Sequence, residues 1–141
     1  MTTLLGAVAA IQDVADAMTG IRYAPDYPPD SLNIFPCAIC YGARGERGGL
    51  GGDSWVEAHD IIYCEIHVPR KDLARDVALL MPYVELFCND LLEDVTLGGA
   101  VTAIDGKVSW EVLERTFDAQ GAVKTLCLRF TIPVKLVNAI T

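Results

Sequence analysis

The sequence predicts an α+β domain, with a mostly antiparallel sheet of about five strands and two helices packed on one face. Two segments carry the apolar spacing of amphipathic helices, and several others alternate or run apolar as strands do. Their order along the chain is helix, strand, loop, strand, helix and then three strands. With 141 residues, the chain has the size of one domain, so we treat residues 1–141 as a single unit.

The first helix is expected over residues 3–19, because apolar side chains recur there every three or four positions. The stripe that would face the core is Leu4, Val8, Ile11, Ala15 and Met18. Gln12 falls off this stripe and is expected on the polar side. Thr2 or Thr3 can cap the start of the helix, and Gly20 is placed to end it.

Two strands are expected on either side of a glycine-rich loop. Residues 33–41 form a short apolar run, in which Pro36 favours a sheet edge or a bulge. Six of the twelve glycines lie between positions 42 and 52, so residues 42–54 predict a mobile loop that adds nothing to the core. Residues 55–68 predict a long strand that pairs with the first. Its alternation places Ile62, Cys64, Ile66 and Val68 on one face and Tyr63, Glu65 and His67 on the other.

The longest helical pattern covers residues 70–94, and Pro82 inside it should kink the helix or divide it in two. Its inward stripe is Leu73, Val77, Leu80, Val84, Phe87 and Leu91. Strands are expected at 100–104 and 107–117, joined by a hairpin turn at Asp105-Gly106. A second turn at 118–121 would lead to a long final strand over 122–137.

Composition excludes several classes of function. The net charge is −8, from 11 basic and 19 acidic residues, so tight binding to nucleic acid is not expected. The chain has no stretch of about 18 uncharged apolar residues, so no membrane span is expected. Hydrophobic residues make up 52% of this small domain, and we expect some of that apolar surface to be buried in an oligomer.

The N-terminus and the cysteines indicate a reducing compartment. The first basic residue is Arg22, so the start of the chain lacks the charged region of a secretory signal. Five cysteines, an odd number, lie in apolar contexts. We therefore expect free, mostly buried thiols in a chain that folds in the cytoplasm.

Cys37, Cys40, Cys64 and His67 have the ligand types of a Cys3His zinc site. Both pairs fall in expected strands, however, where residues three apart point to opposite faces. The simpler interpretation is core cysteines and a surface histidine, so neither a metal nor another cofactor is expected.

Sites for catalysis are scarce. The two histidines, His59 and His67, lie on one expected strand about 27 Å apart, and no Gly-x-Ser-x-Gly elbow accompanies them. The glycines are not followed by the Lys-Ser or Lys-Thr of a phosphate-binding loop. Paired carboxylates such as Glu93-Asp94 are more simply interpreted as solvated surface charges than as a catalytic pair. We therefore expect a protein that is not an enzyme.

Four features occur in one order along nearly the whole chain: an N-terminal helix with the proline-rich exit 23–29, the alternating strand 61–68, the helix 70–94 that runs into 91–99, and paired strands to the C-terminus. This layout resembles the tail terminator proteins of long-tailed bacteriophages. The resemblance implies a ring, usually of six subunits, that caps the finished tail tube and stops its polymerisation. It also implies that the ring joins the tail to the head connector or stopper protein, in a virion assembled in the host cytoplasm.

Two sets of residues are candidates for contacts with partners; the alternatives are that the loop is a tolerated insertion and that the charges are only solvated. The loop 42–54 would become ordered against the tail tube or connector through Arg44, Glu46, Arg47 and Leu50. Charges at the ends of the second helix oppose the helix dipole and would serve a contact between neighbouring subunits. These charges are Arg70, Lys71 and Arg75 at its start and Glu93 and Asp94 at its end.

Two other functions stay open at this point. One is another head-to-tail joining or neck protein of the same virion, which the pattern of elements separates poorly from a terminator. The other is a small enzyme or ligand-binding module of the cytoplasm. A stable ring in solution would favour assembly, whereas a monomer with a deep pocket would favour ligand binding.

Overall fold

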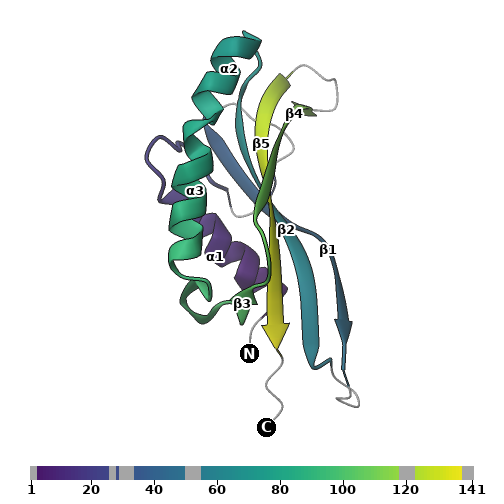
Figure 1. Ribbon diagram of the computed structural model, residues 1–141. Helices are drawn as coiled ribbons and strands as arrows, with labels where there is room; N and C mark the ends of the chain where they lie inside the picture. The colour runs from purple at the N-terminus through teal and green to yellow at the C-terminus, as the bar shows by residue number, and fades with distance from the viewer. Residues whose placement is uncertain (1–2, 26–27, 29–33, 50–54, 118–122, 138–141) are drawn as a thin grey trace.

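The computed structural model describes residues 3–25, 28, 34–49, 55–117 and 123–137 (Figure 1). Its elements are α1 (Leu4–Asp16), β1 (Cys37–Gly48), β2 (Glu57–Pro69), α2 (Leu73–Leu80), α3 (Pro82–Glu93), a 3-10 turn (Leu97–Gly99), β3 (Ala103–Ile104), β4 (Ser109–Phe117) and β5 (Val123–Val137). The five strands form one antiparallel sheet, and the helices lie together on one of its faces. This confirms the predicted α+β fold.

The sheet is centred on β2 and β5, its two longest strands. β1 flanks β2 on one side, and β3 and β4 both pair with the far side of β5. Cys64 lies between Cys40 of β1 and Phe130 of β5, which fixes the register of the middle of the sheet. The pairing of the first two expected strands is confirmed.

The predicted hairpin at Asp105-Gly106 is wrong, because β3 and β4 do not pair with each other. Both run along the same edge of β5, β3 opposite Val134 and β4 beginning opposite Thr131. Between them, the Asp105 amide donates to the carbonyl of Pro133 at 2.8 Å. Pro133 has no N–H to return, so the edge strand is interrupted at this point.

The two expected helices are present, and the second is divided at Pro82 as predicted. Proline occupies the first position of α3, where its missing N–H costs no helical hydrogen bond. Thr3 caps α1 by accepting from the Gly6 amide at 3.0 Å. The helix ends at Asp16, four residues before the expected stop at Gly20, which instead adopts a positive φ of 98° in the following turn.

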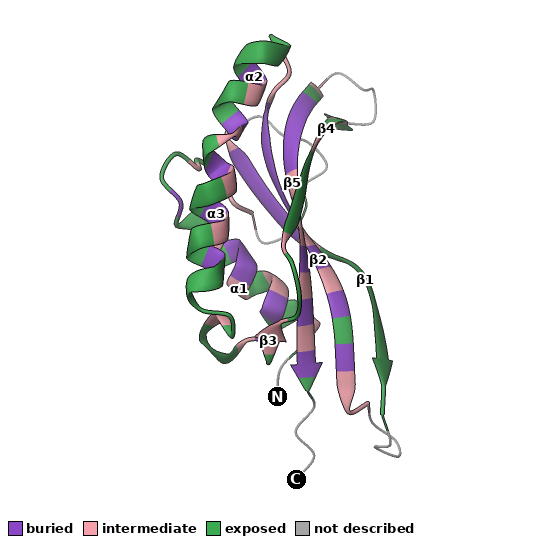
Figure 2. Ribbon diagram, viewed as in Figure 1, coloured by how far each residue is buried: buried purple, intermediate pink, exposed green. Residues whose placement is uncertain are grey.

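The core lies between the helices and the sheet (Figure 2). Its largest fully buried side chains include Phe87 of α3 and Phe130 of β5, whose ring centroids are 4.4 Å apart. Two expectations were wrong. Leu73, assigned to the inward stripe, is 52% exposed. Gln12, assigned to the polar side, is buried, and its Nε2 donates to the Ala38 carbonyl at 3.1 Å.

The glycine-rich segment is the largest error of the sequence-based prediction. Residues 42–48 belong to β1, which begins at Cys37 rather than at residue 33 and pairs with β2 as far as Gly48 opposite Glu57. A bulge between Gly42 and Arg44 shifts the register without ending the ladder. The first part of the expected loop is thus the outer half of a long hairpin, and residues 50–54 lie outside the described residues.

Two smaller expectations concern the strand over 100–104 and the turn at 118–121. The expected strand over 100–104 is reduced to Ala103–Ile104, because the amides of Ala100 and Val101 bond back to Leu97 and Thr96 and extend the turn that begins at the 3-10 helix Leu97–Gly99. The expected turn at 118–121 lies outside the described residues, and the final strand is present as β5. Among the described helices, none is long and apolar enough to cross a membrane.

Candidate functional site

The face of the sheet opposite the helices carries the main cluster of polar side chains. Along β2, Ile62, Cys64 and Ile66 pack into the core beneath the helices, as the alternation predicted. Glu65 and His67 point to the opposite face, yet both are buried. The expectation of a surface histidine at position 67 is therefore wrong.

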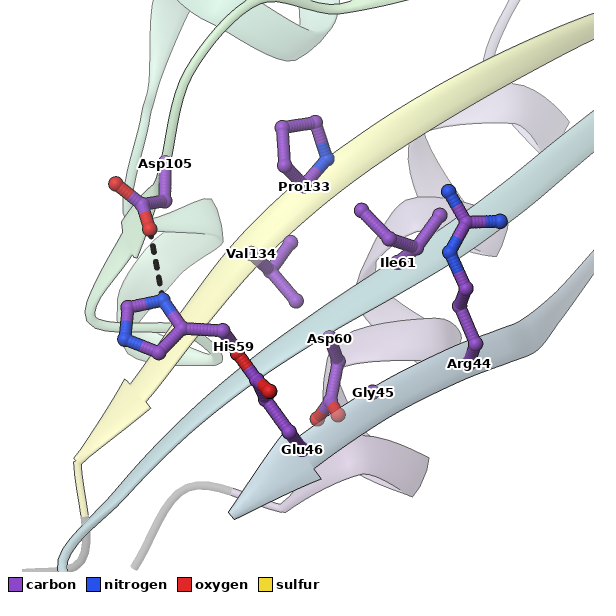
Figure 3. Close-up of a pocket in the computed structure, with 9 residues that line it drawn as sticks. All are labelled: Arg44, Gly45, Glu46, His59, Asp60, Ile61, Asp105, Pro133 and Val134. Carbon is purple, nitrogen blue, oxygen red and sulfur yellow. Dashed lines mark hydrogen bonds and ion pairs between the residues drawn. The ribbon is translucent and has the colours of Figure 1, made fainter. Parts of the chain in front are cut away.

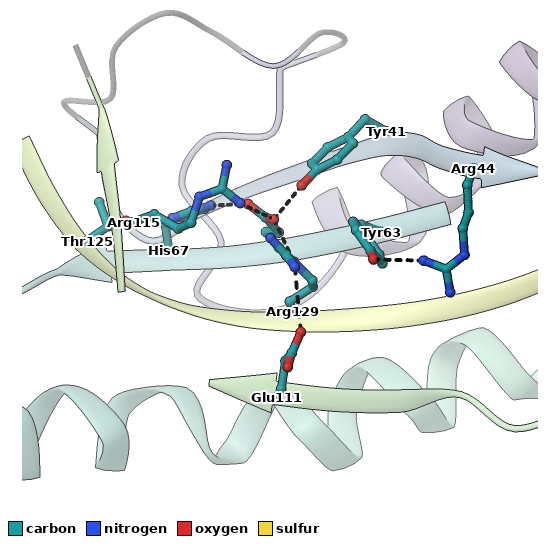
Figure 4. A network of polar contacts seen from close by, with 9 residues as sticks. Tyr41, Arg44, Tyr63, His67, Glu111, Arg115, Thr125 and Arg129 are labelled. Atoms are coloured by element: carbon teal, nitrogen blue, oxygen red, sulfur yellow. Dashed lines mark hydrogen bonds and ion pairs between the residues drawn. The ribbon is translucent and has the colours of Figure 1, made fainter. Parts of the chain in front are cut away.

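Glu65 is the centre of this cluster (Figure 4). Its Oε2 accepts hydrogen bonds from Tyr41 Oη at 2.6 Å, from an Arg115 guanidinium nitrogen at 2.8 Å and from Arg129 Nε at 2.9 Å. Its Oε1 lies 2.9 Å from His67 Nε2. The four partners come from β1, β4, β5 and β2, so one buried carboxylate links four strands of the sheet.

These contacts keep the Glu65 carboxylate ionised. Burial by itself raises its pKa, but the hydrogen bonds from His67 and Tyr41 and the charges of His67 and Arg115 outweigh burial and lower the pKa to about 2. A carboxylate buried without such donors would be strongly destabilising. Here the negative charge is matched by two guanidinium groups that reach the solvent.

Aromatic rings continue the cluster toward the outer half of the hairpin. The Arg129 guanidinium lies 4.5 Å from the centroid of the Tyr63 ring, and Tyr41 meets that ring edge-on at 5.7 Å between centroids. Arg44 donates to Tyr63 Oη at 3.3 Å. Figure 4 shows this continuous row of side chains crossing the strands. The arrangement links side chains of β1, β2 and β5 across the helix-free face of the sheet.

One set within this cluster has the donor types of a metal site. A carboxylate oxygen of Glu65, a ring nitrogen of His67 and Cys127 Sγ lie within 4.8 Å of one another, and all three residues are buried. Each donor except the sulfur already has a partner, because His67 Nδ1 lies 2.8 Å from Thr125 Oγ1 and Nε2 faces Glu65. Burial also raises the pKa of the Cys127 thiol strongly, and two guanidinium groups add positive charge beside Glu65. These features favour a static polar cluster over a cation site.

The four candidate zinc ligands do not converge. Cys40 and Cys64 face each other beneath the helices, whereas Cys37 and His67 face each other on the opposite side of the sheet. This is the separation that the strand geometry predicted. The five cysteines are free thiols, four of them buried.

A second polar site lies in a cavity of about 340 Å³ on the outer half of the hairpin (Figure 3). His59 Nδ1 is 2.9 Å from Asp105 Oδ2, and its Nε2 is 3.5 Å from Glu57 Oε1, which also pairs with Lys135 at 2.8 Å. A histidine oriented by a carboxylate can act as a general base. None of the nine residues that line this cavity has a hydroxyl or thiol group for it to activate, and His59 is half-exposed.

The charged residues expected in the mobile loop lie on β1, and some have partners within the chain. Arg47 forms a two-pronged ion pair with the buried Asp60, at 2.7 and 3.0 Å, and its guanidinium lies 5.3 Å from the Trp55 ring centroid. Arg44 contacts Tyr63, as described above. Glu46 is exposed and makes no side-chain bond to any described residue. Leu50 lies outside the described residues.

Of the charges expected at the ends of the second helix, some also have partners within the chain and others do not. Arg70 pairs with Glu114 at 2.8 Å and lies 3.6 Å from Asp76. Asp94 follows α3 and accepts from the amides of Thr96 and Gly98, so it shapes the next turn. Their placement against the helix dipole thus has an explanation within the chain. Lys71, Arg75 and Glu93 are exposed and have no side-chain partner among the described residues.

Sequence reasoning missed the Glu65 cluster. The available signal was the pair of ionisable residues, Glu65 and His67, inside an otherwise apolar strand, together with arginines on the two later strands. Their convergence depends on the strand order, in which β5 lies next to β2. No protein-family model matches this chain, and no curated protein matches it significantly.

Proposed function

We propose that this chain is a structural subunit that joins copies of itself edge to edge into a closed ring, in the manner of a phage tail terminator. The observation that carries the proposal is that, among the described residues, the sheet has two open edges with different sequences. β1 forms one edge, and β4 forms the other. Pairing of unlike edges is a heterologous contact, and contacts of this type generate rings when the rotation closes.

Both edges offer unpaired backbone groups. From Cys40 to Gly48, the outer side of β1 makes no backbone hydrogen bond to any described residue, and the same holds for the outer side of β4. Exposed edge strands readily accept another strand. A monomer would be expected to protect such long edges, so the pair of open edges supports assembly.

The pairing of β4 with β5 determines which backbone N–H groups of β4 point away from the sheet. Pro133 presents its carbonyl to the β3 and β4 edge, and every second residue of β5 therefore points the same way. The backbone groups of Arg129 and Thr125 therefore bond with β4, whereas those of Leu126 point toward β2. Glu114, opposite Leu126, consequently directs its own N–H away from the sheet. Its amide is available to a neighbouring subunit.

The hairpin of β1 and β2 supports a further contact along the axis of a ring. Its outer half extends past the start of α1, and residues 42–48 of β1 are exposed there (Figure 2). The ion pair between Arg47 of β1 and Asp60 of β2 links the two strands of this arm. Such an arm could reach a tail tube below the ring or a connector above it.

The edge contact is tested by replacing Glu114 with proline, and Glu114→Ala is the matched control. Both changes remove the ion pair with Arg70, but only proline removes the outward N–H. We expect Glu114→Ala to assemble like the wild type and Glu114→Pro to sediment as a folded monomer. Equal assembly by the two variants would contradict pairing through this edge.

The terminator role itself is tested against the tail tube protein of the same virion. A terminator ring added during polymerisation should stop tube growth and remain at one end of each tube. Binding to the head connector without any effect on tube growth would instead favour another head-to-tail joining protein.

A further inference from the structure

Two buried cysteines face each other across the first two strands. Cys40 of β1 is directly opposite Cys64 of β2, and both side chains point into the core beneath the helices. Both are free thiols. The facing Cys40 thiol, followed by burial, raises the pKa of Cys64 well above its usual value.

The ladder shows that this is the closer type of cross-strand pair. The Ala38 amide donates to the Tyr23 carbonyl at 2.9 Å and therefore points away from β2. Cys40, two residues later, points its backbone groups the same way. Cys40 and Cys64 thus form a non-hydrogen-bonded pair, for which Cα atoms lie about 4.5 Å apart. That spacing falls within the range that a disulfide spans.

A cavity gives small molecules a route to one of these thiols. It has a volume of about 330 Å³ and lies between the start of α1 and β1. Its lining is mostly apolar and includes Leu4, Val8 and Cys40. Cys40 is 2% exposed and Cys64 is fully buried, so an oxidant in the cavity meets Cys40 first.

We propose that Cys40 and Cys64 are a redox-active pair that closes to a cross-strand disulfide when a small peroxide reaches Cys40. The Cys40 sulfur attacks one oxygen of hydrogen peroxide, the O–O bond breaks, and Cys40 becomes a sulfenic acid with release of one water. The Cys64 sulfur then attacks the Cys40 sulfur, the S–O bond breaks, and a second water leaves. In total, two thiols are oxidised and one peroxide is reduced to two waters.

The bond would fix the edge strand to the sheet. It would close the 25-residue segment from Cys40 to Cys64, which contains the whole outer hairpin. β1 could then no longer separate from β2 at its inner end. This inference does not depend on the ring, because the two cysteines belong to one chain.

A matched pair of cysteines serves as an internal control. Cys37 and Cys127 are also buried, and each lies directly opposite His67, one on either side of β2. Two strand spacings, about 9.6 Å, therefore separate their backbones. A disulfide needs Cα atoms within about 7 Å, so these two cannot join in the folded chain.

The test treats the folded full-length chain with hydrogen peroxide, blocks the remaining thiols and digests the chain with trypsin without reduction. A Cys88→Ser background removes the one thiol that is not buried. We expect residues 23–44 to be linked to residues 48–70, with a mass about 2 Da below the sum of the two peptides. Recovery of both peptides unlinked at peroxide levels that oxidise other cysteines would overturn the proposal.

Single variants identify the sulfur, because Cys37 and Cys40 share the first peptide. We expect Cys37→Ser to keep the link and Cys40→Ser or Cys64→Ser to abolish it. A link that persists in Cys40→Ser, or one that joins Cys37 to Cys127, would also overturn the proposal. The wild-type linkage and the Cys37→Ser result stand even if a core variant folds poorly.

Discussion

Glu65 is the residue on which the helix-free face of the sheet depends most. Four side chains from four strands converge on its carboxylate, which is 1% exposed. A buried charge contributes favourably only while its partners surround it. Loss of this one charge should therefore weaken the contacts of all four strands at once.

Glu65→Gln is predicted to lower the free energy of unfolding by about 3 kcal/mol, because it leaves Arg115 and Arg129 facing a neutral amide. Urea denaturation at neutral pH measures the loss. The control is Glu111→Gln, which removes an exposed partner of Arg129 at 3.6 Å and should cost less than about 1 kcal/mol. Equal losses in the two variants would show that burial of Glu65 contributes nothing.

The same carboxylate predicts how stability depends on pH. The pKa of Glu65 is lowered from 4.5 to about 2 in the folded chain, so the unfolded chain takes up the proton first. The stabilisation, roughly 3 kcal/mol, is fully present above pH 4.5 and is lost as the pH falls through about 2. The difference in unfolding free energy between the wild type and Glu65→Gln should shrink over that interval. A difference that stays constant from pH 5 to pH 2 would contradict the lowered pKa.

At the scale of single residues, the sequence predicted the face of the sheet on which a side chain lies better than whether that side chain is buried. The alternation along β2 correctly placed Glu65 and His67 on the face away from the helices. It did not reveal that both are buried, since burial depends on Tyr41, Arg115 and Arg129 arriving from other strands. Gln12 shows the same limit, because its burial follows from the Ala38 carbonyl against which α1 packs.

Among the elements, the hairpin of β1 and β2 departs most from what the sequence predicted. High glycine content indicates local flexibility, but it carries no information about a partner strand. β2 supplies that partner, and the ladder holds Gly42, Gly45 and Gly48 in extended backbone. By contrast, the helices and their division at Pro82 were predictable, since their signals are periodic and local.

Within β1, Gly45 is the glycine that the packing against β2 requires. A Cβ at this position would overlap the carboxylate of the buried Asp60, which Arg47 holds from the other side. Gly45→Ala is therefore predicted to break this ion pair and destabilise the chain by about 2 kcal/mol or more. Urea denaturation measures the loss, and hydrogen exchange should locate it in the outer half of the hairpin.

Gly48→Ala is the control for this prediction. A Cβ at Gly48 meets no atom within 4 Å, and the residue lies in the same strand three positions later. We expect a change in stability within about 0.5 kcal/mol. If the two glycines tolerate alanine equally well, the ion pair between Arg47 and Asp60 does not set the form of the hairpin.

On the scale of the whole molecule, one face of the sheet is closed by helices and the other by the Glu65 cluster. The two strand edges and the exposed arm of the hairpin are surfaces that a partner can contact. Lys71, Arg75, Glu93 and Glu46 are charged, exposed and without side-chain partners among the described residues, so they remain the predicted interface residues. The tail terminator interpretation assigns a use to each of these surfaces.

Native mass spectrometry of the purified chain tests the ring most directly. Two unlike edges that pair around a closed circle predict one species of fixed stoichiometry, unchanged over a wide range of protein concentration. For six copies of the 15.3 kDa chain, the mass would be about 92 kDa. A monomer at every concentration, a two-fold dimer that grows no further or a ladder of ever larger species would contradict the account.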